Sequence, residues 1–174
     1  MQPELPVWIT SSGNVETFRL AGTMGANLLT HLLGQSLRDL GAKIAEYRRC
    51  LAASTGAAGG RRGLVTLMLH AFLGDEFDPE RLTSEEVDFL VTRAFERYFE
   101  TSGLFGTVET SLRMTERLHA VGVDEVACLI DFGVDFEPVM ASLERLDELR
   151  RRVTAAPAPP APPARGTARP SPGR

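Results

Sequence analysis

The chain has 174 residues, of which 43% are hydrophobic and 24% charged, and this composition is typical of a single globular domain. The net charge of −4, with no basic block outside the C-terminal tail, argues against a nucleic-acid partner. No stretch approaches the roughly 20 apolar residues of a membrane-spanning helix. Cys50 and Cys128 fit no metal or redox spacing, so we expect reduced core thiols in a cytoplasmic protein.

The composition changes after residue 153. Residues 154–174 are dense in Pro and Ala and show no apolar periodicity. Such a segment cannot bury enough apolar surface to offset the entropy lost on ordering, so we predict a disordered tail. The folded domain is therefore expected to span residues 1–153.

Within residues 1–153, short apolar runs alternate with helical patterns. We predict strands at 7–10, 26–33, 64–74 and 123–133, helices at 14–25, 36–54, 84–100 and 137–153, and over 102–122 a loop followed by a helix. This repetition predicts an α/β fold with parallel strands and right-handed crossovers. An open doubly wound sheet and part of a (β/α)8 barrel both fit, and both place ligand sites at the C-terminal ends of the strands.

The first candidate site is the turn that follows the first predicted strand. Ser11, Ser12, Gly13 and Asn14 stand between that strand and the first helix. The unpaired N–H groups of a helix start favour a phosphate, and glycine lets the backbone approach it closely. The same residues also fit a simple helix cap by Asn14, so the pattern leaves both interpretations open.

Three further positions could contribute to a site. Gly106 and Thr107 form a second possible helix start, for which capping is again the alternative. His31 and His70 lie late in predicted strands and are the candidate catalytic residues, although a histidine with ordinary core contacts would fit the pattern as well. No constellation of metal ligands is present in the sequence, so no metal is expected.

Four strings follow one another over about residues 2–150: TSSGNVETFRLAGTMGANLLTHLLGQ, VTLMLHAFLGD, RAFERYFETSGLFGTVET and GVDEVACLIDFG. They resemble bacterial luciferase-like flavin monooxygenases, and within these the subgroup associated with polyketide and nonribosomal-peptide biosynthesis. The resemblance implies a (β/α)8 TIM barrel that binds reduced flavin mononucleotide (FMN) and uses molecular oxygen. It also implies that residues 11–14 hold the flavin phosphate, that the start of the helix at Gly106 and Thr107 lies on the same barrel face, and that His31, Gln35 and His70 line the cavity.

The chain departs from this family in two respects. It corresponds to four βα units, strands five to eight of the barrel, and the segment near residues 74–84 is short. A partial barrel would leave strand edges at 7–10 and 124–130. We expect these edges to be covered by a homodimer partner, by the missing barrel half or by curling of the chain into an open sheet. We therefore expect at most weak flavin affinity for the isolated chain.

Three functions remain open at this point. One is a truncated flavin-dependent monooxygenase that acts on a free or carrier-bound biosynthetic intermediate. The second is a non-catalytic remnant or a module that binds the flavin phosphate. The third is deazaflavin-dependent redox chemistry on the same type of barrel, which the quoted strings favour less.

Overall fold

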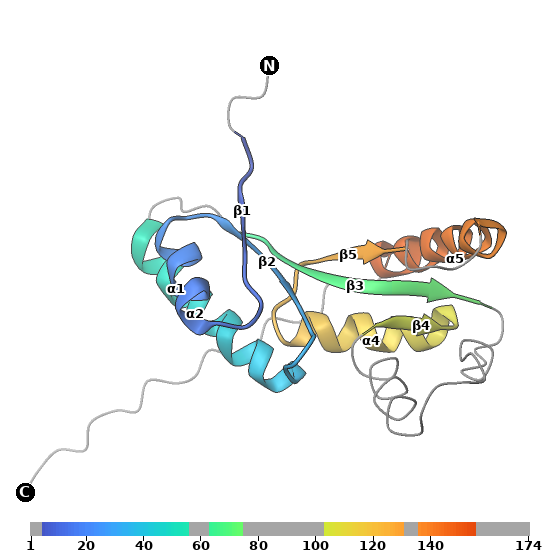
Figure 1. The fold of residues 1–174 in the computed structure, drawn as a ribbon, viewed down its shortest axis with the longest axis horizontal. Helices are drawn as coiled ribbons and strands as arrows, with labels where there is room; N and C mark the ends of the chain where they lie inside the picture. Colours follow the sequence, from blue (N-terminus) through green and yellow to red (C-terminus); the bar gives the residue numbers. More distant parts are fainter. Residues whose placement is uncertain (1–4, 56–62, 75–102, 131–135, 156–174) are drawn as a thin grey trace, which may run out of the picture.

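The computed structural model describes residues 5–55, 63–74, 103–130 and 136–155, which form alternating strands and helices (Figure 1). In chain order these are β1 (Trp8–Thr10), α1 (Val15–Thr23), β2 (Asn27–His31), α2 (Leu37–Thr55), β3 (Val65–Leu73), β4 (Leu104–Gly106), α4 (Val108–Ala120), β5 (Glu125–Leu129) and α5 (Phe136–Ala155). All pairings between the described strands are parallel. The predicted α/β fold with a parallel sheet is confirmed.

Strand β3 is the centre of the sheet. It pairs with β2 and β5 over its first part and with β4 over its last three residues, and β1 pairs with β2. Among the described residues, β1, β4 and β5 thus each have one strand neighbour, and β1 and β5 correspond to the predicted edges at 7–10 and 124–130. The prediction of a loop before the helix at 108–120 was wrong at residues 104–106, because these three residues pair with the end of β3.

The two sides of the sheet differ in burial. Along β3 every second side chain from Val65 to Leu73 is almost completely buried, whereas Met68, His70 and Phe72 between them are half-buried. The registers place Leu29 and His31 of β2 on this half-buried side. We call it the half-buried face of the sheet, and in a barrel such a face would point inward.

The opposite side of the sheet carries the hydrophobic core. Buried side chains from all four described helices join those of β2, β3 and β4 in one cluster. Helices α1 and α2 pack side by side against the β1–β2 side, while α4 and α5 pack together beside β3 and β4 (Figure 1). Helix α2 begins with a reciprocal cap, in which the amide of Asp39 donates to the Ser36 hydroxyl and the amide of Ser36 donates to the Asp39 carboxylate.

One predicted helix end differs from the structure, and several predicted segments lie outside the described residues. Helix α5 continues to Ala155, two residues beyond the predicted domain end. The predicted helix at 84–100, the short segment at 74–84 beyond residue 74, and the tail from residue 156 onward fall outside the described residues.

Neither cysteine is fully buried in the core. Cys50 is half-buried, and Cys128 lies on the edge strand β5 and is exposed. The expectation that both are core thiols was therefore wrong, since the side of β5 away from β3 has no neighbour among the described residues. None of the described helices is long and apolar enough to cross a membrane.

Candidate functional site

The turn from β1 into α1 is held by Ser11. Its amide donates to the carbonyl of Leu29 at 3.0 Å, and its carbonyl accepts from the Thr30 hydroxyl at 2.8 Å. Its own hydroxyl donates to the carbonyl of Asn14 at 3.3 Å, and the residue is buried. Ser11 thus fixes the position of the turn relative to β2, and its hydroxyl is already used within the turn.

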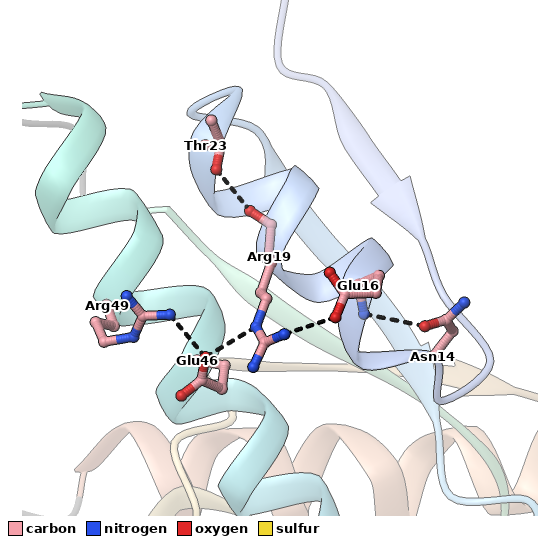
Figure 2. A network of polar contacts seen from close by, with 6 residues as sticks. All are labelled: Asn14, Glu16, Arg19, Thr23, Glu46 and Arg49. Carbon is pink, nitrogen blue, oxygen red and sulfur yellow. Dashed lines mark hydrogen bonds and ion pairs between the residues drawn. The ribbon is translucent and has the colours of Figure 1, made fainter.

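Asn14 is the N-cap of α1. Its side-chain oxygen accepts from the amide of Glu16 at 3.0 Å, as Figure 2 shows. This supports the capping interpretation for Asn14, which uses its oxygen as an acceptor within the helix start. Ser12 is exposed and Gly13, which has φ +113°, is partly exposed, so both residues lie at the surface of the turn. An anion at this corner would therefore contact Ser12, Gly13 and the first-turn backbone rather than the Asn14 oxygen.

A cation from α2 approaches the same turn. A Cβ placed on Gly13 would lie 3.2 Å from Lys43 Nζ and 3.8 Å from Gln35 Oε1. Lys43 donates to Gln35 Oε1 at 2.9 Å, and Gln35 Nε2 donates to the carbonyl of His31 at 2.5 Å. The ends of β1 and β2 and the first half of α2 thus meet at one point.

Sequence reasoning singled out His31 and Gln35 but assigned no role to Lys43. Gly13 and Lys43 are brought together by the packing of α1 on α2. The only sequence signal was that Lys43 is the sole lysine of the chain, and this alone indicates no site.

The corner borders a shallow hollow of about 380 Å³ whose lining carries one cationic and two anionic side chains. Its lining includes Lys43, Asp39 and Glu46. The Ser36 hydroxyl donates to Asp39 and holds its pKa below the ordinary value. Arg49 and Arg19 likewise lower the pKa of Glu46, and Figure 2 shows both guanidinium groups at that carboxylate. Both carboxylates are therefore charged at neutral pH, and they reduce the attraction of the hollow for an anion.

The two histidines share the half-buried face. His31 is paired in register with Met68, and His70 is two residues further along β3, so their Cα atoms are roughly 8 Å apart by ordinary strand spacing. The amide of Leu33 donates to His31 Nδ1 at 3.1 Å. Neutral His31 therefore carries its proton on Nε2, which leaves this N–H available as a donor.

Gly106 and Thr107 form a second, separate corner. Thr107 caps α4 by accepting from the amide of Thr110 at 3.3 Å, and Gly106 has φ +104°. Through the registers, Thr10 is level with Thr66, whereas Gly106 is level with Leu73, seven residues or roughly 23 Å further along β3. One phosphate cannot touch both corners, so they could only hold different parts of a ligand.

The remaining predicted positions give no further chemistry. Within the described ranges no group of three or more His, Cys, Asp or Glu side chains could hold a metal ion. The end of the fourth predicted strand, at Asp131 and Gly133, lies outside the described residues.

No protein-family description matches the chain, and no curated protein matches its sequence. Its fold resembles that of monooxygenase RslO1 from Streptomyces bottropensis, with a TM-score of 0.66 and 10% identity over 89% of this chain and 50% of the other. It also resembles an F420-dependent secondary alcohol dehydrogenase solved with an F420-acetone adduct. There the TM-score is 0.53 and the identity 14%, over 73% of this chain and 43% of the other. The chain thus spans half, or less than half, of the length of these two proteins, and the likeness is one of fold.

Proposed function

We propose that the chain belongs to a luciferase-like flavin monooxygenase and supplies the part of a (β/α)8 barrel that holds the phosphate of FMN. The observation that carries the proposal is the approach of Lys43 to Gly13 at the start of α1. A lysine ammonium beside a glycine turn and a helix N-terminus is a favourable arrangement for a phosphate. The fold likeness to a monooxygenase is consistent with a flavin as the owner of that phosphate.

The half-buried face has side chains that suit the planar ring of such a cofactor. Leu29, Met68 and Phe72 offer apolar surface to a planar ring, and His31 on the same face offers its Nε2–H as a hydrogen-bond donor. Reduced flavin would supply the electrons with which molecular oxygen is activated. In this proposal His31 and His70 orient a natural-product intermediate, free or carrier-bound, or move a proton to or from it.

The test compares FMN with riboflavin, which lacks the phosphate. We expect weak FMN binding by the isolated chain, because the hollow contains Asp39 and Glu46 and the chain covers half of its structural neighbour. Lys43→Gln should weaken FMN binding by about ten- to a hundredfold and leave riboflavin binding unchanged, since removing one charge-assisted hydrogen bond costs about 1.5–3 kcal/mol. Arg150→Gln, which removes an exposed cation on α5, is the control.

Flavin fluorescence quenching gives both affinities. Equal binding of FMN and riboflavin by the native chain would show that no phosphate site exists at this corner. Tight FMN binding by the monomeric chain would contradict the expected weak affinity. F420 in the same titration separates a flavin from a deazaflavin function, which the second structural neighbour suggests.

The second candidate function is a non-catalytic module that retains the phosphate corner. The half-length coverage of the monooxygenase favours it. Oxygen consumption with reduced FMN distinguishes the two functions: turnover above that of free reduced flavin supports the enzyme, and binding without such turnover supports the module.

A further inference from the structure

The exposed apolar side chains of the described residues gather at the two lateral ends of the sheet. Ten large hydrophobic side chains are exposed, and nine of them belong either to the first strand–helix unit with its lead-in or to the last one. The first group is Leu5, Val7, Trp8, Leu20 and Met24, the second is Leu129, Phe136, Met140 and Val153, and the exception is Leu33. We call the two groups the β1/α1 flank and the β5/α5 flank.

Each flank also includes a strand that is paired on only one side among the described strands. β1 and β5 each pair on one side among the described strands, so their other sides present backbone N–H and C=O groups. Apolar side chains beside an unpaired edge mark a surface that is buried in an assembly. Because this occurs at both ends, the occupant has to contact both flanks at once.

We propose that a second copy of the chain is this occupant, and that two copies close into one barrel by two-fold symmetry. A two-fold axis along the strand direction preserves strand direction, so β5 of each copy would pair in parallel with β1 of the other. At the level of Thr66, four strands of one copy lie side by side, namely β1, β2, β3 and β5. Two copies thus supply eight strands, the number of a (β/α)8 barrel.

The helices fit the same closure. Within one copy α1 packs beside α2, and α4 beside α5. Leu20 of α1, its C-cap residue Met24, and Phe136 and Met140 of α5 are all more than 40% exposed. In the closed dimer α5 of one copy packs beside α1 of the other, which buries these side chains. The proposal concerns assembly and stands independently of flavin binding.

The experiment is analytical ultracentrifugation of the full chain over a range of concentrations. We expect a reversible dimer of twice the 19.0 kDa chain mass. Met24→Asp on one flank and Met140→Asp on the other should each raise the dimer dissociation constant at least about tenfold, since burying a charge costs more than 1.4 kcal/mol. Leu33→Asp is the matched control, because Leu33 is 52% exposed but lies outside both flanks.

Mixing the two flank variants tests the symmetry. A mixed dimer has one junction with two native flanks, whereas each variant alone has none, so mixing should restore part of the dimer. Circular dichroism checks that each variant is folded. Hydrogen exchange of the native chain adds a readout without substitutions, since β1 and β5 amides should become protected as the dimer forms.

Three results would overturn the proposal. One is a native chain that stays monomeric at the highest concentration it tolerates, which would assign the flanks to a different polypeptide. The second is association without a fixed size, because a closed barrel leaves no free edge. The third is a control variant, Leu33→Asp, that weakens the dimer as much as the flank variants do.

Discussion

The ammonium of Lys43 lies in the space beside Gly13, although the two residues belong to different strand–helix units: a Cβ added to Gly13 would lie 3.2 Å from Lys43 Nζ. Gly13 also has φ +113°, a conformation that residues with side chains rarely adopt. Glycine at this position thus permits both the positive φ and the close approach of the Lys43 ammonium.

Gly13→Ala should therefore impair both stability and anion binding. We expect a loss of about 1–2 kcal/mol of unfolding free energy from backbone strain, together with weaker FMN binding because the methyl group displaces the ammonium. Urea denaturation and FMN titration measure the two effects. Gly25→Ala is the control: it also has positive φ, but its added Cβ meets no atom within 4 Å. It should lose stability without loss of FMN affinity, and an equal affinity loss in both variants would contradict the role of Lys43.

Gly22 sets the distance between α1 and α2. A Cβ there would lie 2.4 Å from the carbonyl oxygen of Tyr47 and 2.9 Å from Cβ of Cys50. Gly22→Ala should cost about 2–3 kcal/mol, because the helices have to move apart. Gly41→Ala is the matched variant on α2, where the closest atom is 3.3 Å away on the side chain of Val121. There we expect little change or a slight gain from helix propensity, and thermal unfolding compares the two.

Asp124 joins the start of β3 to α2. Its carboxylate accepts from the amide of Val65 at 2.8 Å and from the guanidinium of Arg48, which also donates to the carbonyl of Gly63. Asp124→Ala should cost about 2–3 kcal/mol, because a partly buried guanidinium and an amide lose their acceptor. Asp147→Ala, which breaks exposed ion pairs with Arg150 and Arg151, should have a much smaller effect in the same denaturation assay. Equal effects would contradict a structural role for Asp124.

Tyr47 should make the protein sensitive to alkali. Its ring is buried, its hydroxyl donates to the carbonyl of Ala26 at 2.8 Å, and burial raises its pKa above the ordinary 10.0. Since the folded state binds this proton more tightly, its contribution is complete below pH 10.0 and is lost as the pH rises through the higher folded pKa. Tyr47→Phe should remove this part of the alkaline decline while lowering neutral-pH stability by about 1 kcal/mol for the lost hydrogen bond. Identical pH profiles of unfolding free energy in both proteins would contradict the prediction.

Local patterns predicted the elements that carry a period or a cap. The continuous apolar run of β3 and the three- and four-residue spacings in α2 depend on nearby residues, so they can be recognised in one chain, whereas the half-buried side of β3 was not predicted. Strand β4 could not be recognised, because three residues hold no period and their structure depends on pairing with the end of β3.

For the candidate site, too, the sequence predicted the local features but not the contacts that depend on packing. Asn14 and Thr107 are caps, which are local features, and the sequence pointed to both. The arrangement of Gly13, Gln35 and Lys43 depends on the packing of two helices, and only the structure reveals it. The distance along β3 between the two corners follows from strand registers, which sequence periodicity does not determine.

Lys43 is the sole lysine of the chain, so its ε-amine is a unique chemical handle at the corner. An amine-directed reagent can modify only this side chain and the terminal α-amine, and the two can be separated by peptide mass. A fluorophore or an isotopically labelled methyl group on Lys43 would thus report on the corner without any substitution. The extent of its modification, with and without an added phosphate compound, would measure occupancy of the corner directly.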